Sequence, residues 1–528
     1  MIAYFSMEIG LNNTMKTYSG GLGILAGDTL KSAADLAMDM VAVTLIHEKG
    51  YFKQKINGGQ VEEEDAWDKT HLEECGKEVS VKIEGRQVKV RAWKYIIKSK
   101  GEVPVYFLDT NIEGNSEYDK TLTSSLYGAD DRYRLCQEVV LGIGGVKLLK
   151  ELGYKPNVYH MNEGHACLLT LELFHDEIEN NPGKSIDDYE KIVRQKCVFT
   201  THTPVSAGHD VFDNQTTFSV LTDYPNILLR FIGPQLNTTL LAMRFAKYIN
   251  GVSKKHGDVS REMFPGKEID YVTNGVHTSW MSDAIRKLLD FDEPENLVCA
   301  LKLTDEQILN AHQENKKKLI EYVNSKGHNF DENKFTISFA RRATGYKRAH
   351  LLFRHMEMLK GLDIQIVYAG KAHPRDTEGK DFIKSLKEME RTSGLRFAFL
   401  ENYDMDLAKL MVSGSDIWLN TPLRPMEASG TSGMKAAMNG VPNFSVPDGW
   451  WIEGHVEGIT GWSIGPEHVD GDQDELDSKE IYEKLPIIIH TWKNKTDWAK
   501  IMKNTIALNA SYFNTHRMIK EYSSKAYH

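Results

Sequence analysis

The sequence predicts an α/β protein with two parallel, doubly wound sheets. Along most of its 528 residues, short runs rich in apolar, β-branched and aromatic residues alternate with helical patterns of ten or more residues. This alternation is typical of parallel sheets covered by helices on both faces. The chain is too long for one hydrophobic core of ordinary size, so at least two domains are expected.

Four apolar runs in the first half are expected to be strands of the first sheet. They are Ile2–Ser6, Val41–His47, Val158–Met161 and Val198–Thr201. Between the second and third runs the sequence predicts a β-rich insertion near residues 50–110. Within residues 78–109 the turn EGR separates SVKI from QVKVRAW, and VPVYFL follows, which is hairpin spacing.

The second half repeats the alternation. Its strand candidates are FTISFA (335–340), IQIVYAG (364–370), LRFAFL (395–400) and DIWLN (416–420). DYVTNGV, which starts at residue 270, is expected to cross between the two sheets, and the helical patterns from about Trp492 onward are expected to pack back across the junction. The predicted domains are therefore 1–273, 274–495 and a C-terminal helical segment, 496–528.

Charge and cysteine content exclude several classes of protein. The net charge of −10 disfavours nucleic acid and anionic membranes as partners. The five cysteines are scattered without a CxxC pair, which argues against a disulfide framework or a structural zinc site. The N-terminus MIAYFSMEIG lacks a basic region, and no apolar run approaches the ~18–20 residues that span a bilayer. A cytoplasmic protein is expected.

The segment EASGTSGMKAAMNG (427–440) contains a single lysine, Lys435, among small residues. Thr431 or Ser432 is a candidate N-cap, which would place Lys435 near the first turn, where the helix dipole disfavours its ammonium form. A desolvated lysine there could form a Schiff base, and the free N–H groups with the Thr431 hydroxyl would suit a phosphate. Pyridoxal 5′-phosphate needs both features. An ordinary exposed lysine at a helix start fits the same spacing.

Two further segments could bind anions. FARRATGYKRAHLL (339–352) places Arg341, Arg342, Lys347 and Arg348 directly after an apolar strand, where a phosphate could bind, although a solvated charged turn is the alternative. SGGLGILAGDTL (19–30) has three glycines before a helical pattern and could present N–H groups to an anion. It also fits a loose dinucleotide fingerprint, but no strand precedes it immediately, and a tight turn with close packing remains open.

Two histidine-containing segments, HMNEGHA (160–166) and FTTHTPVSAGH (199–209), each follow a predicted strand. Their His, Asn and Glu side chains could bond sugar hydroxyls. Neither has the ligand spacing of a metal site, so no metal is expected.

Taken together, these segments resemble the glycogen/maltodextrin phosphorylases. EASGTSGMKAAMNG resembles their pyridoxal-phosphate lysine segment, FARRATGYKRAHLL their phosphate segment, and SGGLGILAGDTLKSAADL their glycine segment. YFSMEIG, EKGYFKQKI, MNEGHA, TNGVH, AGKAHP and FLENYD follow in the family's order over nearly the whole chain. The resemblance implies a GT-B-type enzyme with two Rossmann-like domains facing a central cleft. It also implies reversible, retaining phosphorolysis of α-1,4-glucan by inorganic phosphate, releasing α-D-glucose 1-phosphate.

The resemblance also implies residue roles. Lys435 would hold pyridoxal 5′-phosphate as an imine, and the cofactor's phosphate would exchange a proton with the substrate phosphate. The catalytic residues would be Lys435, Arg342 and Lys347. The cofactor would also contact Thr431, Ser432, Arg341 and Tyr403, and the substrate phosphate would contact Gly20, Gly21, Arg342 and Lys347. The glucosyl unit would contact Leu22, Glu163, His165, Asn274, Tyr346, Glu427, Ser429 and Gly430. A homodimer is the habit of the family.

Several positions depart from the family pattern. Arg341 replaces a lysine, Gly433 replaces an asparagine, and Lys247 stands where a sugar-binding histidine is expected, which leaves open how the 6-hydroxyl is held. The chain begins almost at the catalytic core, so we expect a short form without the N-terminal regulatory region, active without a nucleotide effector.

Two other functions remain open from the sequence. One is a nucleotide-sugar-dependent glucosyltransferase of the glycogen synthase type, which needs no pyridoxal phosphate. The other is a catalytically inactive glucan-binding homologue. Trp450, Trp451 and Tyr403 could stack on sugars or belong to the core.

Overall fold

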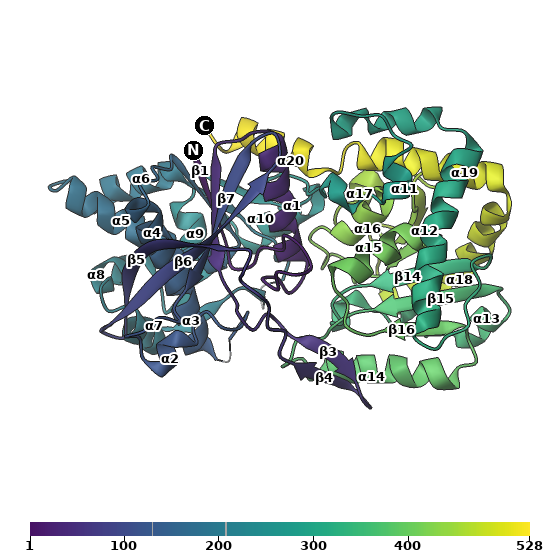
Figure 1. Cartoon of the computed structure of the whole chain (residues 1–528), viewed down its shortest axis with the longest axis horizontal. Helices are drawn as coiled ribbons and strands as arrows, with labels where there is room; N and C mark the ends of the chain where they lie inside the picture. The colour runs from purple at the N-terminus through teal and green to yellow at the C-terminus, as the bar shows by residue number, and fades with distance from the viewer. Residues whose placement is uncertain (129, 206–207) are drawn as a thin grey trace.

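The computed structural model describes residues 1–128, 130–205 and 208–528. Two largely parallel sheets, one from each half of the sequence, lie side by side with helices on both faces of each (Figure 1). The predicted α/β class with two doubly wound sheets is confirmed, and the arrangement is of the GT-B type.

The first sheet has nine strands in the described part of the chain, in the order β13-β12-β9-β8-β1-β2-β7-β6-β5. Its parallel strands are β1 (Ile2–Ser6), β2 (Met40–Leu45), β7 (Glu102–Asp109), β8 (Val158–Asn162), β9 (Cys197–Thr200), β12 (Tyr248–Gly251) and β13 (Asp270–Tyr271). β5 (Glu73–Ile83) and β6 (Arg86–Lys98) extend it as antiparallel strands. The four predicted strands are therefore present, with ends shifted by a residue or two.

The second sheet has six parallel strands among the described residues, in the order β16-β15-β14-β17-β18-β19. They are β14 (Phe335–Ala340), β15 (Ile364–Ala369), β16 (Phe397–Leu400), β17 (Ile417–Asn420), β18 (Asn443–Ser445) and β19 (Gly461–Ser463). The sequence did not predict β18 and β19, because three residues are too few to show a periodic pattern.

The central parallel strands of both sheets are buried on both faces, which explains why they read as continuous apolar runs. In β1, Phe5 enters the core on one face while Tyr4 enters the core on the other. In β14, Phe339 and Ala340 are divided between two cores in the same way.

The helices fill the connections between the strands. Those of the first half are α1 (Gly21–Asp35), α2 (Glu117–Lys120), α3 (Asp131–Val139), α4 (Gly145–Glu151), α5 (Leu169–Asn180), α6 (Ile186–Lys196), α7 (Asn214–Val220), α8 (Pro225–Phe231), α9 (Thr238–Phe245) and α10 (Lys254–Met263). Those of the second half are α11 (Asp283–Arg286), α12 (Asp305–Ser325), α13 (Met356–Lys360), α14 (Thr377–Thr392), α15 (Met405–Gly414), α16 (Thr431–Ala437), α17 (Trp451–Gly454), α18 (Gln473–Lys493), α19 (Lys495–Asn504) and α20 (Thr515–Lys525). None of these described helices has the length and apolar character needed to cross a bilayer.

The chain crosses between its halves at two adjacent places. Val276 of the first crossing exchanges backbone hydrogen bonds with the second, its N–H donating to the Phe513 carbonyl (3.1 Å) and its carbonyl accepting from Thr515 N–H (3.2 Å). α20 then packs on α1, where Met518 and Ile519 share a core with Leu30 (Figure 1). α19 instead packs against α12 in the second half. We therefore propose that the division at residue 273 stands, that α19 belongs to the second half although the expected boundary was 495, and that α20 alone returns to the first half.

The β-rich insertion divides into two parts. β5, β6 and β7 join the main sheet, whereas β3 (Lys53–Ile56) and β4 (Gln60–Glu63) form a separate hairpin that reaches the second half (Figure 1). Gln54 Nε2 donates to the Gly370 carbonyl and Gln60 Nε2 to the Ala372 carbonyl, each at 2.9 Å. The hairpin thus connects the halves on the side away from α20.

Candidate active site

Most of the predicted site residues lie on loops that follow the parallel strands, where the two halves meet. β1 leads to the glycine segment and α1, β14 leads to residues 341–347, and β17 leads to residues 421–430 and α16. Ligands in open α/β sheets bind beyond the carboxyl ends of strands. The halves touch here, because Ser253 Oγ donates to the Ala428 carbonyl (2.7 Å).

α16 starts differently from the prediction. Its N-cap is Gly430, whose φ of 88° lies in the left-handed region, and no side chain caps it. Thr431 and Ser432 are therefore the first two helical residues, and the prediction that either is the N-cap is wrong. The Ser432 hydroxyl accepts a hydrogen bond from Trp418 Nε1 of β17 (3.2 Å). In this short helix Lys435 falls in the last turn, where the dipole favours a cation, so the predicted dipole effect is also wrong.

Burial, rather than the helix dipole, adjusts the ionisation of Lys435. Only 7% of the residue is exposed. Desolvation is the main cause that lowers its pKa to about 8, with Asp28 acting in the opposite direction and Lys31 in the same direction. Its Nζ lies 3.9 Å from the centroid of the Trp280 ring. A substantial fraction of this amine is thus neutral at mildly alkaline pH, as a nucleophilic lysine requires.

Gly433 explains one departure from the family pattern. A Cβ at this position would lie 2.4 Å from Asn443 Oδ1 and 2.9 Å from Trp450 Cζ2. Trp450 is 2% exposed and Trp451 is completely buried. These two tryptophans belong to the core, and the alternative that they stack on sugars is wrong. The buried indole takes the space that any side chain at position 433 would need.

The variant Gly433→Ala is therefore expected to destabilise the protein. Overpacking of this kind costs about 2 kcal/mol or more, which thermal unfolding would show as a lower melting temperature. Gly361→Ala is the matched control, since no neighbouring atom lies within 4 Å of a Cβ there and φ is −80°. Equal melting temperatures for both variants would contradict the packing argument.

The four predicted cations do not act as one cluster. Lys347 Nζ donates to Glu427 Oε2 at 2.6 Å, and Arg341 pairs with the same oxygen. These two cations outweigh the effect of burial and lower the pKa of Glu427 to about 2. Arg348 instead faces α18, where it pairs with Asp474 (2.8 Å) and with Asp477. Arg348 therefore has its own carboxylate partners, apart from Glu427.

Arg341 has spare donors within the site. Its Nε and Nη1 are buried and have no hydrogen-bond partner among the described residues. Buried donors of this kind are costly unless something accepts their hydrogen bonds. Tyr403, a predicted cofactor contact, is half-buried nearby, and its pKa is raised by burial although Arg341 acts against this.

Arg342 points toward the first half. Arg342 is an exposed residue. Desolvation disfavours its charge, but Tyr346, Tyr51 and the carboxylate of Glu8 keep its pKa above the usual value. Glu8 follows β1 and accepts from the N–H groups of Ser19 (2.6 Å) and Gly20 (3.3 Å). The Glu8 carboxylate thus binds the glycine segment and also helps to keep the pKa of Arg342 high.

The glycine segment leaves open space at the start of α1. No atom lies within 4 Å of a Cβ built on Gly20 or Gly21. Gly20 is the N-cap and Gly21 the first helical residue, followed by the half-buried Leu22. First-turn N–H groups of a helix lack intrahelical partners, so those of Gly21 and Leu22 can serve an anion, whereas that of Gly20 already binds Glu8.

Glu163 holds two loops together. It accepts from His202 N–H (2.7 Å), Gly164 N–H (3.1 Å) and Thr203 Oγ1 (3.0 Å). His165 lies 3.3 Å from Asp210, and burial lowers its pKa to about 4. Both predicted sugar contacts thus have protein partners in the structure. Ser206 and Ala207 of the predicted segment 199–209 lie outside the described residues.

Of three other predicted contacts, two have buried polar atoms without a partner among the described residues and one faces a cation. Asn274 Oδ1 and Ser429 Oγ are buried and have no partner in the described part of the chain, and the Tyr346 ring centroid lies 4.4 Å from Lys347 Nζ. The side chain of Lys247, the residue expected in place of a sugar-binding histidine, reaches the C-terminal residue His528. His202 follows β9, and its Nε2 lies 2.6 Å from Asn162 Oδ1.

Asp448 was missed by the sequence interpretation. It follows β18, is 2% exposed, and accepts from Glu427 N–H (2.8 Å) and Gly449 N–H (2.9 Å). Burial is the main cause that raises its pKa to about 7. The only sequence signal was an acidic residue in the turn PDG after a short apolar run.

The variant Asp448→Asn is expected to become more stable relative to the wild type as pH rises. The folded pKa near 7 lies above the ordinary value of 3.8 for an aspartate, so between these values the folded protein keeps a proton that the unfolded chain releases. Wild-type stability therefore falls across this window, and the uncharged variant escapes a cost on the order of 2–4 kcal/mol. Melting temperatures of both proteins from pH 4 to 8 would measure the change. The exposed Asp470→Asn should give a constant difference, and a constant difference for Asp448→Asn as well would contradict the argument.

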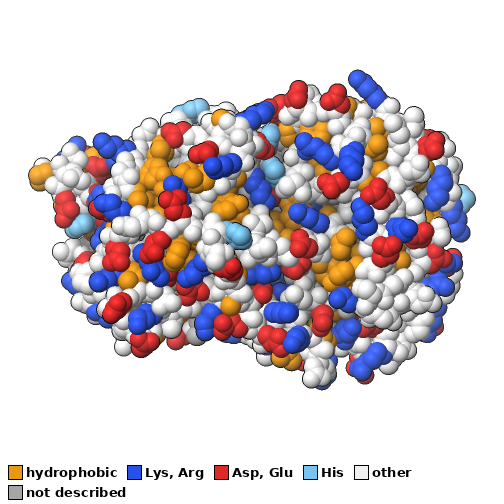
Figure 2. All heavy atoms as spheres, in the orientation of Figure 1, with side chains coloured by type: hydrophobic (Ala, Val, Ile, Leu, Met, Phe, Trp, Pro, Cys, Tyr) orange, Lys and Arg blue, Asp and Glu red, His pale blue; other side chains and the backbone are white. Residues whose placement is uncertain are grey.

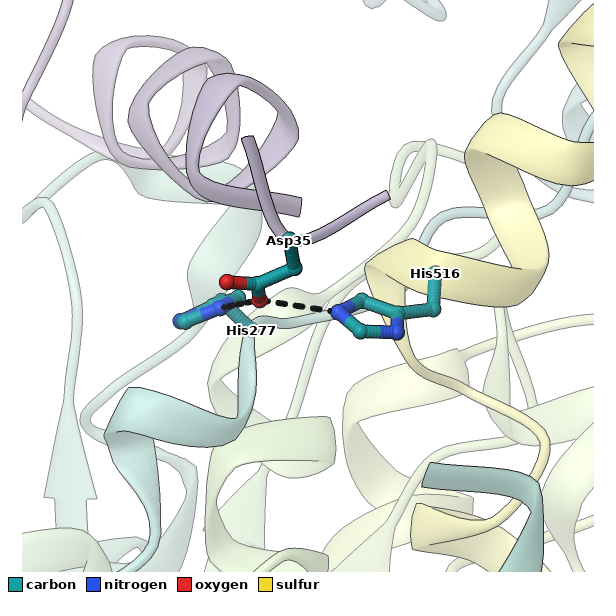
Figure 3. Close-up of side chains that lie close together, drawn as sticks. All are labelled: Asp35, His277 and His516. Carbon is teal, nitrogen blue, oxygen red and sulfur yellow. Dashed lines mark hydrogen bonds and ion pairs between the residues drawn. The ribbon is translucent and has the colours of Figure 1, made fainter. Parts of the chain in front are cut away.

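One cluster of metal-ligand types lies outside this site, at the junction of the halves. Asp35, His277 and His516 place one ligand atom each within 4.8 Å of one another (Figure 3). His277 Nδ1 accepts from Ser279 N–H (3.1 Å), so its Nε2 carries the proton and donates to Asp35 Oδ2 (2.7 Å). A protonated nitrogen has no lone pair for a metal. Burial acts to raise the pKa of Asp35, but the two histidines outweigh it and lower it. The cluster is therefore a hydrogen-bonded connection.

Lys435 in α16 lies beside the cations of residues 341–347 on a GT-B fold. This combination is that of a class of glycosyltransferases. The family model described as carbohydrate phosphorylase matches residues 230–457. Maltodextrin phosphorylase of Thermococcus litoralis is 38% identical over 100% of this chain and 70% of its own length. Glycogen phosphorylase of Aquifex aeolicus is 35% identical over 100% of this chain and 86% of its own. An uncharacterised protein of Methanocaldococcus jannaschii is 33% identical over 99% of each chain. The chain belongs to the α-glucan phosphorylase family.

Proposed function

We propose that the protein catalyses reversible phosphorolysis of α-1,4-glucan by inorganic phosphate, releasing α-D-glucose 1-phosphate with retention and using pyridoxal 5′-phosphate. The observation that carries the proposal is Lys435, a buried amine whose pKa is lowered to about 8. The names of two relatives, maltodextrin phosphorylase and glycogen phosphorylase, support an α-glucan substrate.

The residues present fit the cofactor. Lys435 offers an amine for the aldehyde. The two unpaired donors of Arg341 and the first-turn N–H groups of Thr431 and Ser432 suit its phosphate. When bound, the cofactor supplies a phosphate group that can donate and accept a proton.

The remaining residues would bind and orient the substrates. Two neighbouring phosphates repel each other, so cations and N–H dipoles must offset their charge. We assign this to Arg342, Lys347 and the start of α1 at Gly21. Arg342 stays fully charged because Arg does not deprotonate in proteins, and Lys347 is brought next to the glucosyl contact Glu427.

For the glucosyl unit we propose the hydroxyl and amide groups near residues 427–430. Glu427 can accept from a sugar hydroxyl, because two cations keep it ionised. Ser429 Oγ and Asn274 Oδ1 have no partner among the described residues and are available for further contacts. Leu22, Glu163, His165, Tyr346 and Gly430 stay proposed contacts, and Tyr403 and Gly20 stay proposed for the cofactor and phosphate. The homodimer stays a prediction.

The test combines a spectrum, a peptide map and an assay. We expect near-ultraviolet or visible absorbance of a bound pyridoxal, a pyridoxyl group on the Lys435 peptide after borohydride reduction, and glucose 1-phosphate from maltodextrin and phosphate without a nucleotide. Protein expressed with vitamin B6 that lacks the label and uses a nucleotide sugar would be a transferase of the synthase type. A label without turnover would indicate an inactive glucan-binding homologue.

A further inference from the structure

We propose that α1, a helix of the first half, sets the charge state of Lys435 in the second half through two oppositely charged residues, Asp28 and Lys31. This inference rests on the proposed function, because it concerns the amine that would hold the cofactor. It assigns a positioning role to residues that do not themselves touch the substrates.

Asp28 is connected to Lys435 through one aromatic ring. Its carboxylate is 1% exposed and its Oδ2 accepts from Trp280 Nε1 (2.8 Å) and from His277 N–H (3.2 Å). The face of the same Trp280 ring lies 3.9 Å from Lys435 Nζ. A ring face attracts a cation, and the hydrogen bond to Asp28 fixes where that face points.

Lys31 lies one turn further along α1. Residues three apart on a helix share a face, so Lys31 and Asp28 both face the second half. Lys31 is half-buried, and burial lowers its pKa, with Asp28 acting against the effect and Lys409 of α15 adding to it. Both residues belong to the segment SGGLGILAGDTLKSAADL. The anion-binding role predicted for this segment rested on its glycines alone.

Two charged residues of this one helix act on Lys435. Burial has the largest effect on the pKa of the amine, and Asp28 and Lys31 follow it, acting in opposite directions. Asp28 favours the ammonium form and Lys31 the neutral form. A buried amine surrounded by few charges responds strongly to each of them, because the local dielectric is low.

α1 is held in place relative to the second half at both ends of this face. Asp35, two turns after Asp28, accepts from His277 (2.7 Å) and lies 2.9 Å from His516 Nε2 of α20 (Figure 3). His516 also lies 3.4 Å from Glu293. His277 thus bonds to Asp28 through its backbone and to Asp35 through its ring. Because α1 starts at Gly21, a shift of the phosphate-facing end would also move the charges that act on Lys435.

The experiment follows the reaction of Lys435 with pyridoxal 5′-phosphate as a function of pH. Full-length protein, freed of carbonyl ligands, is mixed with the cofactor, trapped with borohydride after a short time, and the labelled fraction of the Lys435 peptide is measured by mass spectrometry. The rate should rise with pH around the pKa of the amine. Asp28→Asn removes the neighbouring anion and should move the midpoint down by about one unit, whereas Lys31→Gln removes a cation and should move it up by about half a unit.

Opposite directions distinguish an electrostatic role from structural damage, which would move both variants alike. Asp39→Asn, at an exposed carboxylate just after α1 that pairs with the N-terminal amine, is the control, and its midpoint should equal that of the wild type. If Asp28→Asn does not fold, the upward shift of the half-buried Lys31→Gln still tests the proposal. Midpoints that are unchanged or move in the same direction overturn it. Absence of any label on wild-type Lys435 would instead overturn the proposed function.

Discussion

Lys435→Met is expected to abolish phosphorolysis without weakening the fold. Methionine cannot bond to an aldehyde, so we expect no pyridoxyl label and a fall in kcat of about 10⁴-fold or more. Since the folded pKa of Lys435, about 8, lies below the ordinary lysine value of 10.5, burial of this amine opposes folding at neutral pH, and the opposition disappears as pH rises above 10.5.

The uncharged variant should therefore melt at the same temperature as the wild type or higher at pH 7. Assays of glucose 1-phosphate release and a thermal melt on one preparation would measure both effects. Lys409→Met, at an exposed position on α15, is the control and should change neither. Activity retained above one per cent in Lys435→Met, or lost together with the fold, would contradict the assignment.

Glu427→Gln is expected to lower kcat while strengthening the binding of phosphate. The carboxylate pairs with Arg341 and with Lys347 (2.6 Å for Lys347) and stays ionised at working pH because its pKa is about 2. The neutral amide leaves these cations without their anion, so an incoming phosphate meets less competition. The neutral amide is also a weaker hydrogen-bond acceptor for a sugar hydroxyl than the carboxylate.

We expect a kcat lower by about 10²–10³-fold and a KM for phosphate lower by about 3–10-fold. The melting temperature of the variant should be lower in chloride buffer and should recover on adding phosphate or sulfate. Glu401→Gln, an exposed carboxylate after β16 that accepts from Ile56 N–H (3.0 Å), is the control and should leave both constants unchanged. A rise in the KM for phosphate would show that Glu427 does not compete with it.

The fold class could be predicted because it depends on local patterns. A parallel strand that is buried on both faces must be apolar throughout, so Ile2–Ser6 and FTISFA at 335–340 were visible in the sequence. β18, only Asn443–Ser445, gave no such pattern. The hairpin β3–β4 could be predicted as β structure, but its attachment to Gly370 and Ala372 depends on backbone groups that no sequence pattern reveals.

The site shows the same division. The charge and small side chains around Lys435, and the acid–cation composition of residues 341–347 and 427, are properties of the sequence. The pairing of cations with acids is not a property of the sequence. Arg348 and Lys347 are adjacent in the chain yet face opposite directions, Arg348 toward Asp477 and Lys347 toward Glu427. A left-handed residue at Arg348, with φ of 45°, accompanies that change of direction.

The charge distribution over the surface does not help to separate what the sequence predicts about the site from what only the structure shows. Acidic and basic side chains are interspersed over the face shown in Figure 2, in keeping with the modest net charge of the chain. Lys435, Lys347 and Glu427 of the site are buried, and burial is a property of the folded protein.

The sequence by itself determined the class of fold, the family and the order of the chemical segments, since periodicity, composition and motif residues are local. Only the tertiary structure decided that burial, rather than a helix dipole, lowers the pKa of Lys435, that Asp448 supports Glu427, and that Asp28 of the first half acts on a lysine of the second. Desolvation and charge–charge interaction depend on distances between segments far apart in the chain, and only packing of the two halves sets those distances.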